Sequence, residues 1–324
     1  MKKHMVSAIN EVLNDEMSKD ESIMILGEDV GVDGGVFRVT EGLIDKYGEK
    51  RVVDTPLAEA GIVGSSIGLS INGVKPIAEI QFSGFSYQAF HHIKQHIARY
   101  RQRTNSTGNL PLIVRAPCAG GIRALEHHSE SPEGFFIHCQ GLTVVMPSGP
   151  YEAKGLMASA IKSQDPVIFL EPKKIYRSFK EEVPDESYEI PLREANIRKE
   201  GTDLTVISWG AMIKQSEQAI AELEQEGVSI ELIDLRTLWP FDIETVRKSV
   251  EKTGRAVIVQ EATRACSLSS ELVAQIQNRN ALQLKAPVGR VTGWDVPFPQ
   301  FALENYFMPY KDRIVKEMKR ILDF

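Results

Sequence analysis

The side chains best suited to move protons near neutral pH are the histidines, and all seven lie in the first 138 of the 324 residues, at positions 4, 91, 92, 96, 127, 128 and 138. An unperturbed imidazole titrates near pH 6.5, so a histidine can accept or donate a proton at working pH. Any histidine-dependent step therefore belongs to the first part of the chain. The adjacent residues His127 and His128 are either an exposed loop pair or an acid/base site.

One carboxylate, Glu59, stands in a setting that could give it a chemical role. It follows the turn Asp54–Pro56 at the start of an apolar helical segment, with Leu57 and Ile62 nearby. A poorly solvated carboxyl group can hold and deliver a proton. A first-turn acid can also do no more than favour the helix dipole, which is worth under about 1 kcal/mol. The residues alone leave both interpretations open.

Three other patterns are weaker. Residues 64–68 match the G-x-S-x-G signature of a hydrolase, but a turn and a helix start precede them rather than a strand, so we expect Ser66 inside a helix. His92 and His96 have the spacing of zinc ligands without a suitably placed third ligand, so we expect a solvated face. The chain has neither G-x-G-x-x-G nor a phosphate-binding G-x-x-x-x-G-K-[ST] motif, which disfavours an NAD or ATP enzyme.

Alternating strands and helices must position these residues. The first part of the chain is predicted to contain strands at 22–26, 75–80, 110–115, 142–146 and 166–170, with helices at 59–71, 85–101, 132–138 and 150–163. A polar segment at 177–201 is predicted to be a linker on the surface. Strands at 204–208, 230–235 and 256–260 then alternate with helices at 211–225 and 243–253, and Gly254 is placed to stop the second helix.

This pattern predicts two α/β domains, each with a parallel sheet and right-handed crossovers, at residues 1–176 and 202–324. Composition agrees, with 42% apolar and 25% charged residues. A net charge of −6 without long basic runs argues against nucleic acid or anionic lipid as partners. Three separated cysteines fit buried thiols in a reducing compartment, and no signal peptide or membrane-length apolar run is evident. We therefore expect a cytoplasmic protein.

Five segments carry a specific resemblance. Residues 26–30 (LGEDV), 54–60 (DTPLAEA), 79–82 (EIQF), 128–133 (HSESPE) and 234–237 (DLRT) occur in order and at matching intervals. Together they resemble the beta subunit of the thiamine-diphosphate-dependent decarboxylating component of 2-oxoacid dehydrogenase complexes, in the transketolase-like superfamily. The similarity runs from about residue 4 to Phe324. It implies a pyrimidine-binding α/β domain followed by a transketolase-like C-terminal domain.

The resemblance also implies roles for particular residues. Glu59 would face the pyrimidine nitrogen of thiamine diphosphate and promote the imino tautomer that activates the cofactor. Phe85 would stack on the pyrimidine, although an aromatic residue here is otherwise ordinary core. Glu28 and Leu57 would line the same pocket. His128, which precedes Ser129 as in the family, would be the acid/base group for the substrate and for acyl transfer to a lipoyl arm.

A monovalent-cation loop is also implied, in which potassium is bound mostly by backbone oxygens. The corresponding residues are Leu112, Ala160, Ile161, Ser163 and Asp165. Ser163 and Asp165 stand where the family has an acid and an amide, so the loop departs from the pattern.

The Gly-Asp-Gly and Asn-Asn motifs that hold Mg²⁺ and the diphosphate in such enzymes are absent from the chain. The magnesium ligands must then come from another polypeptide. We therefore expect an alpha subunit, a heterotetramer of two alpha and two beta chains, and activity only in that assembly. The resemblance further implies docking to a lipoyl acyltransferase core, whose basic binding segment suits an acidic partner.

The substrate stays open at this point. Pyruvate, a branched-chain 2-oxoacid and, in an acetoin dehydrogenase, acetoin all fit the motifs. A non-catalytic assembly subunit of the same fold is the remaining alternative, against which the joint presence of Glu59, Phe85 and His128 argues.

Overall fold

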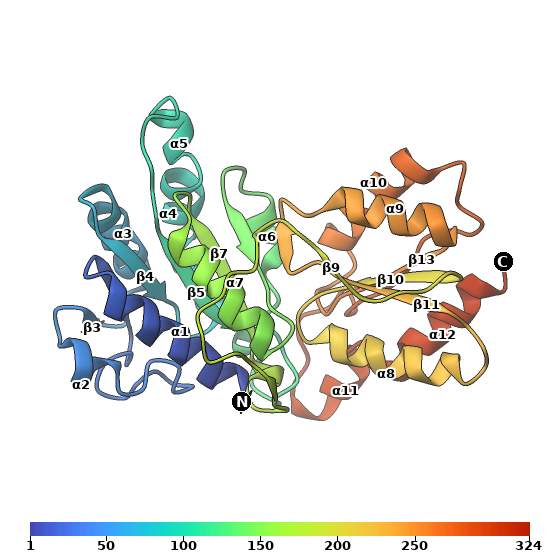
Figure 1. Ribbon diagram of the computed structural model, residues 1–324, viewed down its shortest axis with the longest axis horizontal. Helices are drawn as coiled ribbons and strands as arrows, with labels where there is room; N and C mark the ends of the chain where they lie inside the picture. The colour runs from blue at the N-terminus through green and yellow to red at the C-terminus, as the bar shows by residue number, and fades with distance from the viewer.

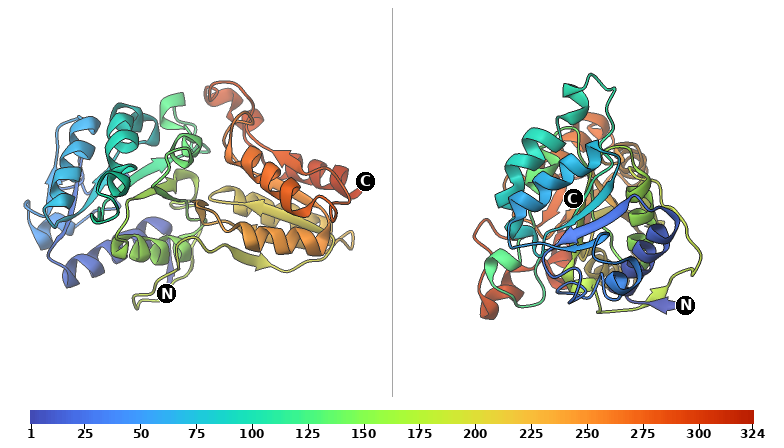
Figure 2. Two further views of the ribbon diagram at one scale, coloured as in Figure 1. Left: turned by 90° about the horizontal axis from the view of Figure 1, so that it is seen from above. Right: turned by 90° about the vertical axis from the view of Figure 1, so that its left-hand side faces the viewer.

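The computed structural model describes all 324 residues, which form two α/β domains side by side (Figure 1). The first domain is the blue-to-green half, and the second is the yellow-to-red half; Figure 2 shows that each has its own sheet between helical layers. The predicted fold class is confirmed. No helix combines the length and the apolar character needed to span a bilayer.

The first domain is built on a seven-stranded sheet. Its strands, in spatial order, are β12 (Thr237–Trp239), β6 (Thr143–Val145), β7 (Val167–Pro172), β5 (Ile113–Cys118), β4 (Lys75–Glu79), β2 (Ile23–Gly27) and β3 (Val52–Asp54). Six of these strands are parallel, and the edge strand β12 is antiparallel to β6. Because β12 comes from beyond residue 201, the second part of the chain completes the sheet of the first.

The second domain has a five-stranded sheet. The order is β14 (Gly289–Val291), β13 (Ala256–Val259), β10 (Leu204–Ser208), β11 (Ile230–Asp234) and β9 (Asn196–Lys199). Strand β9 pairs antiparallel with β11. The prediction of a linker throughout 177–201 is therefore wrong for residues 196–199. Within the same segment, β8 (Glu181–Glu182) pairs with the N-terminal strand β1 (Lys2–Lys3).

Helices cover both faces of each sheet. In the first domain, the α-helices are α1 (Met5–Lys19), α2 (Leu43–Tyr47), α3 (Glu59–Ile71), α4 (Phe90–His92), α5 (Tyr100–Arg103), α6 (Glu133–Ile137) and α7 (Pro150–Lys162). In the second, they are α8 (Met212–Glu224), α9 (Ile243–Thr253), α10 (Leu268–Asn280), α11 (Glu304–Phe307) and α12 (Lys311–Leu322). Short 3₁₀ helices span Ser83–Ala89 (η1), Glu126–His128 (η3), Lys173–Ile175 (η4) and Phe301–Leu303 (η5), and η2 (Ile93–Ile97) is a π-helical turn.

Side chains alternate between two apolar cores along each strand. In β4 and β5, Ile77 and Ile113 join the core beneath α1 and α7, whereas Ala78 and Val114 join the core beneath α3 and η2. This is the period-two pattern of a strand buried on both faces. Both cores continue into the second domain, where Leu204 extends the first of them and Ile207 extends the second. The two domains consequently share their packing rather than meeting only through a linker.

Several local expectations can be checked. Ser66 lies buried within α3 and donates its hydroxyl hydrogen to the Ile62 carbonyl oxygen at 2.7 Å, as expected for a packing residue. Gly254 ends α9 with φ of 72°, a conformation that glycine adopts without strain. The single helix predicted at 85–101 is wrong, because that stretch is divided among η1, α4, η2 and α5. Cys266 is exposed, so the expectation of buried thiols holds only for Cys118 and Cys139.

A buried ion-pair network ties together three central strands. Arg115 on β5 makes two 2.7 Å contacts with the carboxylate of Glu171 on β7, and it also pairs with Glu79 at the end of β4. Tyr176 donates its hydroxyl hydrogen to Glu171 at 2.6 Å. The Arg115 side chain is fully buried, so both of its acidic partners depend on it for compensation of their charge.

We expect Arg115→Met to lower the free energy of unfolding by about 3–5 kcal/mol, because it leaves two buried carboxylates without a cation. Urea unfolding of the purified chain measures this change. Arg101→Met is the matched control, since it removes a partly exposed pair with Asp165 and should cost at most about 1 kcal/mol. Equal losses of unfolding free energy in the two variants would contradict the larger stabilising contribution that we expect from the buried network.

Candidate active site

The predicted site residues converge on one edge of the seven-stranded sheet. Glu28 directly follows β2, Glu59 begins α3 shortly after β3, and Phe82 follows β4. The loop after β5, residues 119–132, carries His128. Since these strands are parallel, their carboxyl ends lie at the same edge, which is where ligands bind in open α/β sheets.

Two carboxylates are buried side by side at this edge. Glu59 is 1% exposed and Glu28 is 5% exposed. Burial raises the pKa of Glu28, and the nearby charge of Glu59 raises it further, while the Ala58 N–H opposes the shift. One carboxylate oxygen of each residue, Oε2 of Glu59 and Oε1 of Glu28, is buried without a hydrogen-bond partner. Buried polar atoms are nearly always paired, so these two oxygens mark a place where a ligand donor fits.

Aromatic rings and imidazoles form the next layer. The Phe82 and Phe85 ring centroids are 5.7 Å apart, and the His128 ring lies 4.4 Å from Phe82 and 5.3 Å from Phe85. Helix α3 packs against η1, which carries Phe85, and η1 packs against η3, which carries His128. The structure thus connects the elements that carry Glu59, Phe85 and His128 through two consecutive packing contacts.

His128 sits in surroundings that favour its neutral form. Burial against the phenylalanines lowers its pKa, the charges of His127 and Lys173 lower it further, and Glu126 opposes them. Its Nδ1 atom is buried without a partner in the chain. A largely neutral imidazole with an unsatisfied nitrogen can accept a proton from a group bound at this edge.

Other predicted residues are placed differently. The Leu57 side chain is 76% exposed, so in the single chain it borders the site without closing it. The Leu112 and Ala160 carbonyl oxygens accept backbone hydrogen bonds from Val167 and Ser163, at 2.9 and 3.1 Å. The Asp165 carboxylate pairs with Arg101. The potassium loop stays a prediction.

Sequence reasoning missed a second buried cluster behind the His128 loop. Lys173 is 3% exposed, and burial lowers its pKa to about 8 despite the nearby Cys118 and Glu261. Burial likewise raises the pKa of Glu133 to about 7, with a smaller contribution from the charge of Glu261. These residues come from β5, η4, α6 and the segment after β13. No spacing along the chain could reveal the cluster, because only the meeting of the two domains assembles it.

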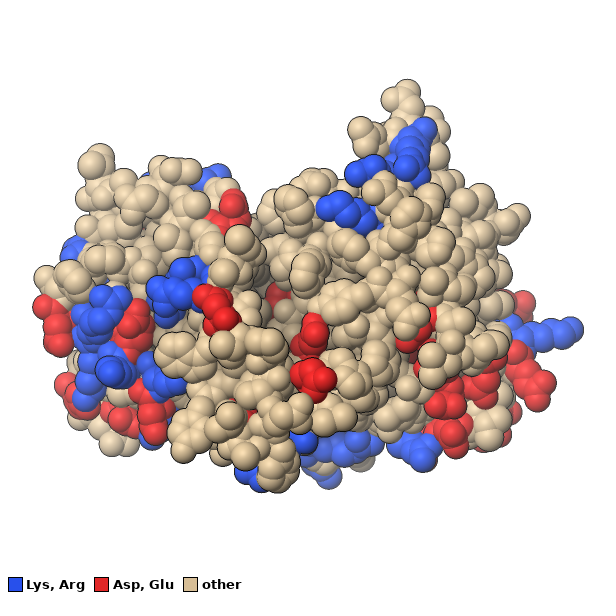
Figure 3. Space-filling model, turned by 180° about the vertical axis from the view of Figure 1, so that it is seen from behind, with Lys and Arg blue, Asp and Glu red and all other residues tan.

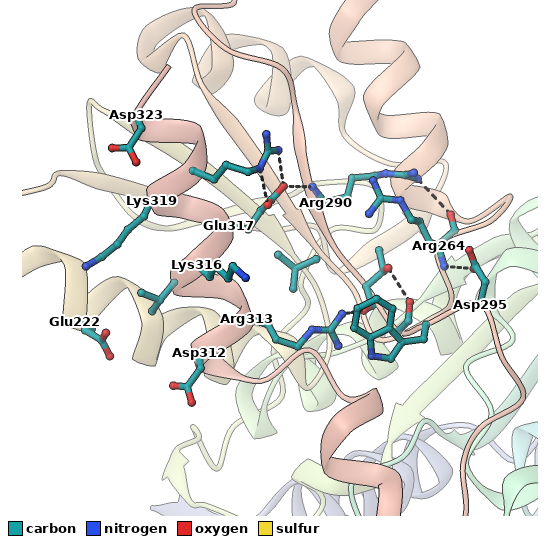
Figure 4. Close-up of a pocket in the computed structure, with 16 residues that line it drawn as sticks. Glu222, Arg264, Arg290, Asp295, Asp312, Arg313, Lys316, Glu317, Lys319 and Asp323 are labelled. Carbon is teal, nitrogen blue, oxygen red and sulfur yellow. Dashed lines mark hydrogen bonds and ion pairs between the residues drawn. The ribbon is translucent and has the colours of Figure 1, made fainter.

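A hollow in the surface of the chain lies elsewhere. It measures about 960 Å³ and is lined by residues of α12 and of the segment 290–295 in the second domain (Figure 4). Glu317 accepts hydrogen bonds from the Arg320 guanidinium and from the Arg290 backbone N–H. Figure 4 shows Asp295 accepting from the backbone N–H of Arg264. None of the predicted site residues lines this hollow, and the chain contains no cluster of three metal-ligating side chains.

Comparison with known families defines the class of protein. Residues 1–178 match the transketolase pyrimidine-binding domain, and residues 193–314 match the transketolase C-terminal domain. A solved structure described as a split-gene transketolase, an inactive beta4 tetramer, superposes with a TM-score of 0.81 over 99% of this chain and 98% of the other. That pair is 21% identical, so it supports the fold alone.

Closer relatives identify the family. The pyruvate dehydrogenase E1 component subunit beta of Staphylococcus epidermidis is 50% identical over 320 residues, covering 99% of this chain and 98% of its own. The Staphylococcus aureus subunit of the same name is 49% identical over the same length. The chain belongs to the family of 2-oxoacid dehydrogenase E1 beta subunits, whose two domains are of the transketolase type.

Family membership implies thiamine diphosphate as cofactor. The residues at the sheet edge fit its pyrimidine end. Glu59 and Glu28 present buried, unpartnered carboxylate oxygens of the kind that ring and amino nitrogens would complete. Phe82 and Phe85 present aromatic surface beside them.

The buried Glu133 leads to a pH-dependent prediction. Burial raises its pKa from an ordinary value of 4.5 to about 7, so the folded protein retains a proton that the unfolded chain releases between these values. Its contribution to stability is full below pH 4.5 and is lost as pH rises through 7. Glu133→Gln keeps the shape of the side chain without its charge. We therefore expect the variant to gain stability relative to the unmodified protein at pH 8, and to gain less at pH 5.

Thermal unfolding at several pH values measures this difference. The surface variant Glu49→Gln should leave the pH profile of the melting temperature unchanged. A Glu133→Gln profile parallel to that of the unmodified protein would show that Glu133 does not titrate in this way.

Proposed function

We propose that this chain, assembled with an alpha subunit, carries out the oxidative decarboxylation of pyruvate with thiamine diphosphate and the reductive acylation of a lipoyl group. The observation that carries the proposal is the buried, unpartnered Oε2 of Glu59 at the carboxyl edge of the sheet. Pyruvate is favoured over branched-chain 2-oxoacids and acetoin by the relatives of about 50% identity, which are named for pyruvate.

Glu59 is the proton-holding residue of the site. When bound, thiamine diphosphate supplies the acidic carbon of its thiazolium ring as the nucleophile that takes up the 2-oxoacid. Glu59 would hold a proton at the carboxyl oxygen that faces the pyrimidine nitrogen, in a poorly solvated position at the start of α3. Such a positioned acid typically contributes a factor of 10²–10⁴ in rate.

Phe85 and Glu28 would orient the ring that Glu59 contacts. A ring stacked on Phe85 gains about 0.5–1.5 kcal/mol beyond simple burial, provided its face is presented correctly. The raised pKa of Glu28 suits it to a hydrogen-bonding role beside Glu59, since two adjacent carboxylates avoid both being charged. Leu57 would complete the wall on the open side.

His128 would exchange protons with the substrate. Its neutral form, favoured by burial and by the charges of His127 and Lys173, can accept a proton through the unpartnered Nδ1 atom. The same imidazole, once protonated, can return that proton when the acyl unit passes to a lipoyl arm. The His128 ring packs edge-on against Phe82 and is only half-buried.

The open side of the site supports a partner chain. Four large apolar residues that are close in sequence to the site residues are more than half exposed. They are Val32, Leu57, Leu125 and Phe135. Contiguous exposed apolar surface usually marks an interface. The face seen in Figure 3 has a hollow between the two domains, with much uncharged surface around it.

The alpha subunit would supply what this chain lacks, namely the ligands of Mg²⁺ and of the diphosphate. We further propose a cytoplasmic heterotetramer of two alpha and two beta chains, docked on a lipoyl acyltransferase core. A potassium ion at the loop of Leu112, Ala160, Ile161, Ser163 and Asp165 belongs to the same proposal. Because the loop is proposed to bind potassium, we expect removal of potassium to lower the stability of the assembled enzyme.

Glu59→Gln tests the role of the carboxyl group. In the reconstituted enzyme, we expect a fall of at least about 100-fold in the decarboxylation rate with an unchanged melting temperature, because the amide cannot hold an acidic proton. The rate is followed with an artificial electron acceptor. Asp45→Asn is the control, since it removes another first-turn helix acid, one that is exposed on α2. Near-normal turnover by Glu59→Gln would refute the assignment.

Reconstitution tests the shared site and the substrate together. The purified chain alone should show no decarboxylation, and addition of the alpha subunit should restore it, because each chain holds only part of the cofactor. The assembled enzyme is then assayed with pyruvate, 2-oxoisovalerate and acetoin, and we expect the highest kcat/KM for pyruvate. Full activity of the single chain would overturn the shared site, and a preference for another substrate would overturn the proposed specificity.

A further inference from the structure

The loop that carries His128 is closed at its base. We call residues 119–132 the His128 loop. The Ala119 N–H donates to the Glu130 carbonyl oxygen at 2.8 Å, which brings the two ends of the loop together. From the first domain, the Ser83 hydroxyl donates to the same carbonyl oxygen at 3.0 Å, and the Lys173 ammonium group donates to the Ala119 carbonyl oxygen.

A single carboxylate oxygen of the second domain contacts both ends of this loop. Oε1 of Glu261 accepts hydrogen bonds from the Gly120 N–H and, at 3.4 Å, from the Ser131 hydroxyl. Glu261 is the second residue after β13 and is 6% exposed. Its pKa is raised by burial and opposed first by the Gly120 N–H, which is consistent with a buried acceptor that depends on these contacts.

The second domain also contacts the middle of the loop. The Glu304 carboxylate accepts from the Arg123 N–H at 2.9 Å, and the Gln300 side chain donates to Glu126 at 3.0 Å. The Arg123 guanidinium lies 4.8 Å from the centroid of the Phe301 ring. These contacts follow the loop on its outer side, whereas His128 faces Phe82 and Phe85 of the first domain.

The fit is close at the point where Glu261 binds. A Cβ atom at Gly120 would come within 2.3 Å of the Phe298 ring. Only glycine therefore lets the backbone N–H reach the Glu261 carboxylate beneath that ring. The contact between the loop and the second domain is consequently specific in position, and not a general surface contact.

We propose that Glu261 is a positioning residue that holds the His128 loop in the geometry required for proton exchange by His128. The inference rests on the role of His128 proposed above. It assigns to the second domain a part in the chemistry of the first: the buried carboxylate sets where the loop ends lie, and the loop sets how deeply the imidazole is packed.

The variants separate hydrogen bonding from charge. Glu261→Leu removes the acceptor, and Glu261→Gln retains an oxygen acceptor for Gly120 without the negative charge. Ser131→Ala removes one of the two contacts and leaves the carboxylate intact, so it serves if Glu261→Leu fails to fold. Glu231→Gln is the matched control, because Glu231 is also a buried acid of the second domain but contacts Gly201 and Lys252 instead of the loop.

Two readouts are measured on the enzyme reconstituted with its alpha subunit. The first is hydrogen–deuterium exchange in residues 119–132, for which we expect at least a tenfold acceleration in Glu261→Leu, a smaller one in Ser131→Ala, and little change in Glu261→Gln or the control. The second is the dependence of kcat/KM on pH. Its rising limb should move upward, toward the ordinary histidine value of about 6.5, when the loop loosens and His128 becomes more solvated.

The groups facing His128 are His127, Lys173 and Glu126, and all of them remain in every variant. Unchanged exchange in Glu261→Leu, or equal loosening in Glu261→Gln, would overturn the proposed contact. An unmoved pH limb despite faster exchange would overturn the positioning role. The exchange readout does not depend on catalysis, so it decides the contact even if His128→Asn proves fully active and the proposed role of His128 fails.

Discussion

The parallel alignment of β2, β3, β4 and β5 is the constraint on which the site depends. Parallel strands end at a common edge, so the residues that follow them are brought together although they are spread over about a hundred positions in the chain. The buried Arg115, held between Glu79 and Glu171, secures the central strands at that edge. Without this register, Glu59 and His128 would have no reason to share a pocket.

This arrangement supports our proposal that the chain presents half of a binding site. Buried carboxylate oxygens on Glu28 and Glu59 have no partner within the chain, which is costly unless a ligand completes them. The exposed Leu57 lies beside them. An unsatisfied polar interior next to exposed apolar surface is the physical form expected of a cofactor site shared between two subunits.

The two domains are also less separate than a linker between them would suggest. Strand β12 extends the sheet of the first domain, both apolar cores run through the boundary, and Glu261 reaches the His128 loop. The second domain is therefore part of the support of the active-site edge.

By itself, the sequence determined the two α/β domains, the strand and helix alternation and, through five short segments, the family. These features depend on local periodicity and on contiguous residues, which a linear chain displays directly. It also singled out Glu59 as an acid at a helix start among apolar neighbours, but those neighbours left its role open, and the family resemblance implied the catalytic one. The division of residues 85–101 into four short helices was not visible, since packing against α3 and η3 overrides local helical preference.

Only the tertiary structure decided which distant residues meet. The pairing of β12 with β6 and the cluster of Lys173, Glu133 and Glu261 depend on how the two domains pack. The pairing of β9 with β11 and the exposure of Leu57 are likewise set by the folded chain and not by local pattern. Contacts between residues 120 and 261 leave no periodic trace in a single chain, because their separation is set by folding topology. The environment that lowers the pKa of His128 is likewise created only when the loop closes over Phe82.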